Sequence, residues 1–239
     1  MNLLLISNST NPGEAYLGWP REEIMNYCLK RNIKRVLFIP FAGVTFSYDD
    51  YEAKVAAVYK TFGVEIYSIH KEPDALKAVR EAEAIAVGGG NTFHLVREMQ
   101  KLGLMKAIRD RVLEGIPYMG WSAGSNVACP SLKTTNDMPI VEPESFDCMS
   151  LIPFQINPHY LDAHPSNHGG ETREQRIEEF LVANPDMYVA GLREATLLLY
   201  ENGKLELRGR HPMRLFKNGM LPTEHQPGDD IQFLMNQKV

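Results

Sequence analysis

A single serine stands between two glycines where an apolar run gives way to a helix-forming segment. The run is "IPYMGW", and the segment "GWSAGSNVA" that overlaps it holds Ser122 at the centre of a G-x-S-x-G pattern. Such a turn lifts a hydroxyl out of the end of a strand, and the flanking glycines let neighbouring backbone pass close by. The N–H of Ala123 then points to the same place from a helix start, where it can stabilise an oxyanion. We therefore expect Ser122 to be a nucleophile rather than only a helix cap.

A serine hydroxyl needs a base at neutral pH, and His159 has the most suitable setting. It ends the predicted strand "LIPFQINPHY" (151–160), and Pro158 fixes the approach of the backbone. A packing or surface role is the alternative. A metal site made of His159, His164 and His168 is disfavoured, because no H-E-x-x-H pattern occurs and no cysteine lies near. We expect no metal ion and no cofactor.

The base in turn needs an acidic group to orient it, and two carboxylates qualify. Glu194 follows directly on an apolar strand end in "VAGLREATLLLY". Asp137 lies in "KTTNDMPIV", inside an irregular loop after the serine turn that could fold back over the site. The residues alone leave both assignments open, and either carboxylate could simply be solvated.

A glycine-rich loop, "VGGGNTFHL", follows another strand-like run. Its three glycines leave backbone N–H groups unobstructed, and Asn91 or Thr92 is placed to cap the next helix. No G-K-[ST] follows and the G-x-G-x-x-G spacing is lacking, so neither a P-loop nor a dinucleotide site is favoured. In an open parallel sheet both glycine turns lie at the same edge. We expect Gly89 and Gly90 to supply oxyanion donors there.

The elements that position these residues follow a βαβ pattern. Continuous apolar runs alternate with helix-period segments, which is typical of a parallel sheet covered on both faces. A single helix is predicted over "TFHLVREMQKLGLMKAIRDRVLEG" (92–115). Later strands near "MYVAGL", "TLLLYEN" and "KLELRG" are predicted to add antiparallel strands at the sheet edge. We expect one α/β domain over residues 1–239. The early strand-like runs are "NLLLIS" (2–7), "VLFIPF" (36–41), "VEIYSI" (64–69) and "AIAVGGG" (84–90).

Composition limits the possible partners and compartments. The 239 residues are 44% hydrophobic, enough for a sizeable core, and the net charge of −5 comes without any Lys/Arg-rich run, so nucleic acid is not an expected partner. No run approaches a membrane span and no leader is evident. Three cysteines without C-x-x-C spacing suit a reducing compartment. We expect a cytoplasmic protein with no membrane association.

Taken together, the motifs resemble the aspartyl dipeptidase (peptidase E) family of serine peptidases. They are "GGGNT", "GWSAGSN", "TTNDMPI", "INPHYLDAH" and "GETREQRI", and the resemblance covers most of the chain. It implies a mostly parallel, doubly wound, flavodoxin-like sheet, related in architecture to class I glutamine amidotransferases, and hydrolysis of dipeptides with N-terminal aspartate. It also implies Ser122 as nucleophile and His159 as base. The family offers both Glu194 and Asp137 as orienter, and we favour Glu194 because a strand end holds a carboxylate more rigidly. Asp137 is then left to bind the substrate's amino group or to order its loop.

An aspartyl substrate needs a local cation, and Arg173 is the best placed. If Thr172 is an N-cap, Gln175 completes a capping box and Arg173 takes the first helical position. A cation there opposes the helix dipole, which makes sense if an anion binds at that end. Pairing with Glu171 or Glu174 is the alternative. We assign Arg173 and Asn91 to substrate binding.

Two other functions stay open: a cyanophycinase-like peptidase acting on an aspartate-arginine polymer, and a non-catalytic anion-binding module. The preferred second residue of the substrate and the oligomeric state do not follow from the sequence.

Overall fold

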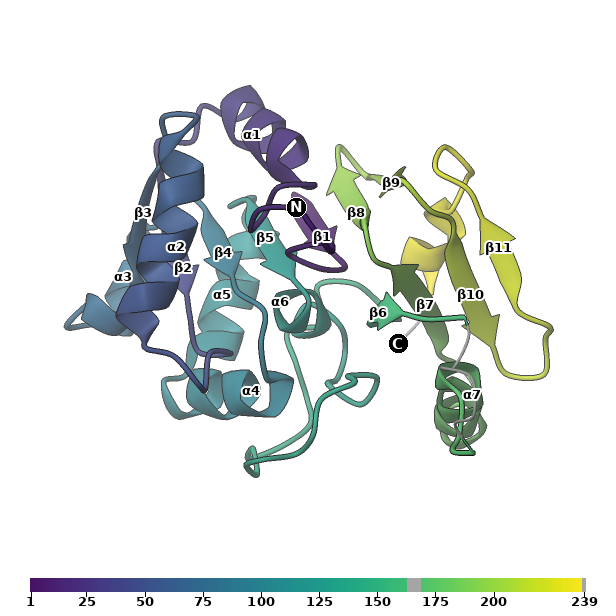
Figure 1. Ribbon diagram of the computed structural model, residues 1–239. Coiled ribbons are helices and arrows are strands. Elements are labelled where there is room, and N and C mark those ends of the chain that lie inside the picture. Colours follow the sequence, from purple (N-terminus) through teal and green to yellow (C-terminus); the bar gives the residue numbers. More distant parts are fainter. Residues whose placement is uncertain (163–168, 238–239) are drawn as a thin grey trace.

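The computed structural model describes residues 1–162 and 169–237 and contains two sheets. The central sheet has seven strands in the order β3-β2-β4-β5-β1-β8-β9 (Figure 1). The strands from β3 to β1 are parallel, whereas β8 runs antiparallel to β1 and β9 antiparallel to β8. This arrangement confirms the predicted mostly parallel α/β fold with antiparallel C-terminal strands. The bounds are β1 Leu3–Ile6, β2 Arg35–Ile39, β3 Glu65–Ser68, β4 Ile85–Val87, β5 Tyr118–Trp121, β8 Thr196–Glu201 and β9 Lys204–Gly209.

Helices cover both faces of the central sheet, which explains why its strands read as continuous apolar runs. In β1, Leu3 and Leu5 pack into a core shared with α3, α4 and α5, while Leu4 and Ile6 pack into a core shared with α1 and α2. All four side chains are buried. No helix in the described ranges combines the length and apolarity needed to cross a bilayer. The helices are α1 Arg21–Lys30, α2 Tyr48–Lys60, α3 Ala75–Glu81, α4 Thr92–Lys101, α5 Leu104–Leu113, α6 Ala123–Asn126 and α7 Arg173–Ala183, with short 3-10 helices η1 Ile69–Lys71 and η2 Gln232–Asn236.

The single helix predicted over residues 92–115 is two helices, α4 and α5. Gly103 separates them with a φ of +66°, a left-handed conformation that glycine adopts without strain. Its N–H bonds the carbonyl of Gln100 at 2.9 Å, which closes the last turn of α4. The apolar period alone could not reveal this break because both helices pack their apolar faces into the same core.

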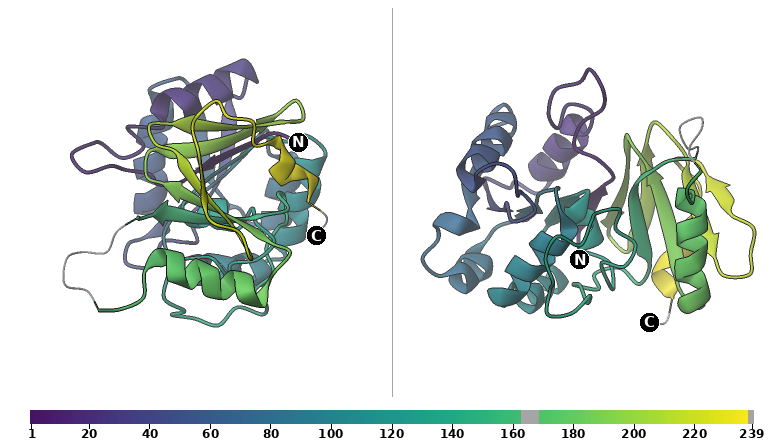
Figure 2. Two further views of the ribbon diagram at one scale, coloured as in Figure 1. Left: turned by 90° about the vertical axis from the view of Figure 1, so that its right-hand side faces the viewer. Right: turned by 60° about the horizontal axis from the view of Figure 1, so that its bottom comes forward.

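The second sheet has four strands in the order β11-β10-β7-β6. Strand β7, predicted at the edge of the central sheet, belongs here instead, and only β8 and β9 extend the central sheet. One face of the second sheet packs on α7 and the opposite face joins the core of the central sheet (Figure 2). The two sheets meet where β7 passes into β8 through Glu194 and Ala195. The bounds are β6 Gln155–Tyr160, β7 Tyr188–Arg193, β10 Met213–Lys217 and β11 Thr223–His225.

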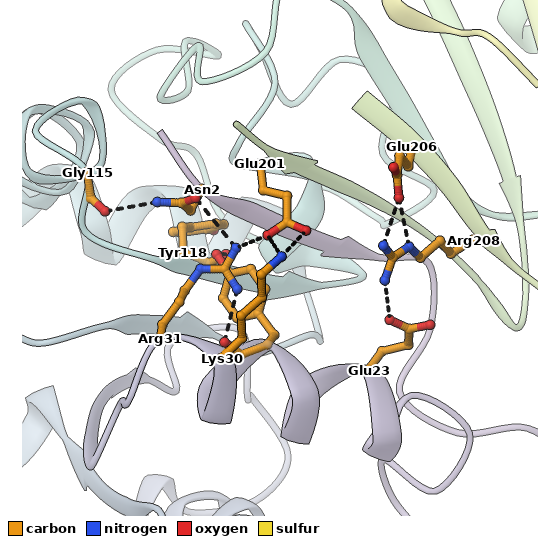
Figure 3. A network of polar contacts seen from close by, with 10 residues as sticks. Asn2, Glu23, Lys30, Arg31, Gly115, Tyr118, Glu201, Glu206 and Arg208 are labelled. Carbon is orange, nitrogen blue, oxygen red and sulfur yellow. Dashed lines mark hydrogen bonds and ion pairs between the residues drawn. The ribbon is translucent and has the colours of Figure 1, made fainter. Parts of the chain in front are cut away.

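Ion pairs fasten α1 to the added strands β8 and β9 (Figure 3). Glu201 accepts from Lys30 at 2.8 Å and from Arg31 at 2.7 Å, and Arg208 bridges Glu23 and Glu206. The hydrogen bond from Lys30 contributes most to holding the pKa of Glu201 below its ordinary value. These contacts hold the C-terminal end of β8, whose first residue follows Glu194 and Ala195 in the chain.

Candidate active site

Ser122 occupies the turn between β5 and α6 in a conformation that few residues adopt. Its φ is +54° and its ψ is −113°, and its N–H donates to Ile6 O at 3.0 Å. Both glycines of the pattern are required by space. A Cβ on Gly120 would lie 2.3 Å from the carbonyl oxygen of Gly124, and a Cβ on Gly124 would lie 2.1 Å from that of Val87. The strained turn is therefore held by close packing on both sides, as expected where strain serves a function.

His159 also has a positive φ, +53°, in β6 at a point where the pairing with β7 is irregular. Its N–H donates to Ser7 Oγ at 3.0 Å, and that hydroxyl donates to Leu192 O at 2.8 Å. The preceding carbonyl, of Pro158, accepts from Asn136 Nδ2 at 2.6 Å. A β-bulge of this kind re-aims a side chain. Ser7 was not anticipated, although its place directly after β1 puts it at the edge where ligands bind.

Three side chains from separate elements form a hydrogen-bonded line. His159 Nε2 lies 3.0 Å from Ser122 Oγ, and His159 Nδ1 lies 2.8 Å from Glu194 Oε1. The turn that carries Glu194 is fixed by the N–H of Ala195, which has a φ of +59° and donates to the buried Asn8 Oδ1 at 2.8 Å. With Nδ1–H donated to the carboxylate, Nε2 is left to accept the serine proton, which is the arrangement of a nucleophile, a base and an orienting acid.

Asp137 is not hydrogen-bonded to His159 and has other partners. Its Oδ2 accepts from Thr92 N at 2.7 Å, Thr92 Oγ1 at 2.6 Å and Thr135 Oγ1 at 3.0 Å. A carboxylate at a helix N-terminus is stabilised by the helix dipole, and here it ties the loop before β6 to the start of α4. The structure therefore places Glu194 against His159 and gives Asp137 a role in ordering this loop.

The glycine loop lies directly against the serine turn. A Cβ on Gly89 would come within 2.9 Å of Ser122 Cβ, and Gly90 has a φ of +140°. The hydrogen bonds of the described residues include none donated by the N–H of Gly89, Gly90 or Ala123. Three donors without protein acceptors thus lie in the serine turn and in the glycine loop beside it, as their expected use as oxyanion donors requires.

Tyr51, in α2, holds the glycine loop in place. Its hydroxyl donates to Gly89 O at 2.9 Å and receives hydrogen bonds from Trp121 Nε1 at 3.2 Å and Tyr16 Oη at 3.3 Å. Burial raises the pKa of Tyr51, so the hydroxyl stays protonated and remains a donor. Because a trans peptide points its C=O and N–H in opposite directions, fixing Gly89 O also fixes the N–H of Gly90.

Arg173 has the predicted setting but lies behind the wall of the catalytic cavity. Thr172 Oγ1 accepts from Gln175 N at 3.1 Å and Gln175 Oε1 accepts from Thr172 N at 2.7 Å, which confirms the capping box. The Arg173 guanidinium donates to Asn136 Oδ1. Burial lowers the pKa of Arg173, and Asp137 partly offsets this effect. The predicted alternative partners are otherwise engaged: Glu171 pairs with Arg176 and Glu174 with Arg214.

Asn91 is not brought into the cavity. It is the N-cap of α4, where its Oδ1 accepts from His94 N at 3.0 Å and its Nδ2 donates to Met138 O at 2.9 Å. Its amide thus serves the helix start and the neighbouring loop.

A cavity of about 730 Å³ opens over Ser122 and His159. Thr135, Asn136 and Asp137 line it and also line a smaller cavity of about 150 Å³ that contains Arg173, so these three residues form the partition between the two spaces. The opposite wall was not anticipated from the sequence. It consists of Ser9, Thr10, Tyr16, Phe46, Asp50, Tyr51 and Lys54.

The metal site considered from the sequence cannot be placed, because His164 and His168 lie outside the described residues. Within the described ranges, ligand atoms of Asp49, Glu52 and His70 come within 4.8 Å of one another. Lys71 Nζ lies 2.7 Å from Asp49 and 2.5 Å from Glu52, so an ammonium already occupies this group and offsets part of its negative charge.

Sequence comparison identifies the family. A model of the family described as "Peptidase family S51" matches residues 3–208. The chain belongs to peptidase family S51. Together with relatives named Peptidase E, this finding confirms the resemblance to the peptidase E family and the expectation of a serine peptidase.

Known proteins match the chain over nearly its whole length. Peptidase E of Nostoc sp. is 52% identical over 233 residues, which is 98% of this chain and 96% of the relative. Peptidase E of Salmonella newport is 49% identical over 219 residues, or 92% and 95% of the two chains. The crystal structure of a peptidase from an acI-B1 Actinobacterium aligns with a TM-score of 0.66 at 17% identity and covers 96% of each chain, which shows a shared fold.

Proposed function

We propose that this S51 peptidase is a serine dipeptidase that cleaves dipeptides with N-terminal aspartate. The observation that carries the proposal is the hydrogen-bonded line from Ser122 through His159 to Glu194, set beside unpaired backbone N–H groups. The relatives named Peptidase E support the same activity. Reducing conditions suit the free cysteines, so we place the activity in the cytoplasm.

The reaction is acyl transfer through a serine ester. Ser122 Oγ attacks the peptide carbonyl carbon while His159 Nε2 takes its proton, and Glu194 stabilises the imidazolium that forms. The N–H groups of Ala123, Gly89 and Gly90 are the candidate donors to the carbonyl oxygen as it becomes negative. His159 then returns the proton to the leaving nitrogen, the C–N bond breaks and the second amino acid departs. Water attacks the ester by the same route, which releases aspartate and restores the serine.

We assign recognition of the aspartyl side chain to Arg173. Burial lowers the pKa of Arg173, which means that the protein only partly compensates the charged guanidinium for its lost solvation. A bound carboxylate would stabilise that charge. Asn136, its present acceptor, lines the catalytic cavity, so a substrate carboxylate that replaces Asn136 Oδ1 as acceptor reaches the guanidinium from the cavity side. Asp137 lines the same cavity and is the nearby anion for the substrate's ammonium group.

A panel of Asp-Leu, Glu-Leu, Asn-Leu and Leu-Asp tests the activity, with the aspartate-arginine polymer as the alternative substrate. We expect turnover of Asp-Leu far above the others and a loss of about 10⁴ or more in kcat for Ser122→Ala. Arg173→Ala should raise KM for Asp-Leu and reduce the preference over Asn-Leu, whereas Arg80→Ala, on α3 and outside the lining of both cavities, should not. Retained activity in Ser122→Ala, or preference for the polymer, would rule the proposal out.

A further inference from the structure

One wall of the cavity is formed by α2, by Phe46 just before it and by residues that precede α1. Apart from Tyr51, which holds the glycine loop, this wall has no role in the proposed chemistry, yet it carries unusual groups. Three aromatic rings meet there: Tyr16 and Tyr51 lie edge to face at 6.4 Å between centroids, and Phe46 and Tyr51 at 5.2 Å. Phe46 is 47% exposed. An exposed phenylalanine inside a catalytic cavity offers apolar surface that a bound side chain can cover.

Lys54 stands beside these rings. It follows Tyr51 by three residues on α2, so both reach the same face of the helix. Its Nζ lies 4.2 Å from the centroid of the Tyr16 ring, a cation–π contact that holds the ammonium at the cavity. Among the described residues that line the cavity, Lys54 is the only lysine or arginine.

The acidic groups near Lys54 have other partners. Asp50, one turn earlier on α2, accepts from the hydroxyl of Ser47 at 2.6 Å at the start of the helix. Asp49 pairs with Lys71. Within the described ranges no carboxylate comes within 4.0 Å of Lys54 Nζ, so its charge is available to a ligand.

We infer that Tyr16, Phe46, Tyr51 and Lys54 form the subsite for the leaving residue, with Lys54 binding its free α-carboxylate and the rings contacting an apolar side chain. The inference rests on the proposed function and adds the recognition of the second residue. An Asp-X dipeptide carries two carboxylates and one ammonium group. Arg173 is assigned to the side-chain carboxylate and Asp137 to the ammonium, which leaves Lys54 for the terminal carboxylate.

The decisive comparison uses Asp-Leu and Asp-Leu-amide, which differ only in the charge of the terminal group. Lys54→Gln should reduce kcat/KM for Asp-Leu about tenfold, mainly through KM, and leave Asp-Leu-amide nearly unchanged. Added salt should reduce the ratio of kcat/KM for Asp-Leu to kcat/KM for Asp-Leu-amide in the parent enzyme. Lys60→Gln is the matched control, because Lys60 is exposed on the same helix but lies outside the cavity lining.

The aromatic part is tested separately with Phe46→Ala. The parent enzyme should favour Asp-Leu over Asp-Gly, and this preference should shrink in the variant.

Equal losses of Asp-Leu and Asp-Leu-amide turnover in Lys54→Gln would assign this lysine to the aspartyl part of the substrate and overturn the inference.

Binding to Ser122→Ala keeps the test independent of turnover. If that variant binds Asp-Leu more tightly than Asp-Leu-amide, and Lys54→Gln in the same background removes the difference, the subsite stands even where the catalytic proposal fails. If it binds both alike, or neither, the subsite is wrong.

Discussion

The hydroxyl of Ser7 accepts the backbone N–H of His159 at 3.0 Å, across 152 positions of sequence. The same hydroxyl donates to the carbonyl of Leu192 in β7, two residues before Glu194. One buried oxygen thus links the end of β1 to the strands that carry the base and the acid. Since His159 has a positive φ, this contact helps to hold a strained backbone in the position that the imidazole needs.

We expect Ser7→Ala to lower kcat about tenfold with little change in KM, because a small displacement of a catalytic group is costly. The variant should also lose about 1–3 kcal/mol of unfolding free energy, because the His159 N–H is left without a partner. Steady-state kinetics and urea unfolding measure the two effects.

Ser68→Ala is the control for general destabilisation. Ser68 is equally buried, and its hydroxyl contacts Phe38 O and His70, outside the catalytic cavity. It should lose stability without losing kcat. A drop in kcat of the same size in both variants would mean that Ser7 acts only through stability.

A second prediction distinguishes the role of the Glu194 carboxylate from that of the Asp137 carboxylate. Glu194→Gln should reduce kcat by about 10³–10⁴, because a neutral amide neither stabilises the imidazolium nor fixes the tautomer of His159. Asp137→Asn should instead leave kcat largely intact, raise KM because the anion assigned to the substrate's ammonium group is lost, and lower the free energy of unfolding by about 1–2 kcal/mol through weaker capping of α4. Kinetics and denaturation of both variants decide the matter. A larger loss of kcat in Asp137→Asn would exchange the two roles.

The sequence could predict which site residues stand at the ends of strands, because local patterns indicate where a strand ends and a helix begins. Those ends lie together at one edge of the sheet. Ser122, His159 and Glu194 come together as such positions would suggest. It could not predict that β7 leaves the central sheet, since the change depends on a turn at Ala195 with a φ of +59° that a non-glycine residue rarely adopts.

The cavity wall that contains Tyr51 and Lys54 also could not be predicted from the sequence. Tyr51 has the apolar period of a core residue in α2, and that period does not show that its hydroxyl reaches Gly89. Likewise, the spacing of Lys54 identifies an exposed helical lysine, and only the packing of Tyr16 against α2 places it at a cavity. Contacts between segments far apart in the chain determine both roles.

The contact between Glu201 and α1 gives a pH-dependent prediction. The hydrogen bond from Lys30 lowers the pKa of Glu201, so its carboxylate stabilises the fold above the ordinary pKa of glutamate, near 4.3. That contribution is lost as the pH falls through the lowered value. Glu201→Gln should therefore cost about 1 kcal/mol at pH 7, and the difference from the parent should shrink below about pH 4. Urea unfolding at both pH values checks this, and a constant difference would contradict it.

The last prediction concerns the hydrogen bond from Tyr51 to the glycine loop. Tyr51→Phe removes the donor to Gly89 O, so the peptide that presents the Gly90 N–H is free to rotate. We expect kcat to fall about tenfold or more with KM nearly unchanged, because an oxyanion donor acts mainly in the transition state. Tyr59→Phe is the control on the same helix, since the Tyr59 hydroxyl contacts only Met119 Sδ, at 3.5 Å, among the described residues. If both variants lose kcat equally, or if Tyr51→Phe changes KM alone, Tyr51 does not position the loop for catalysis.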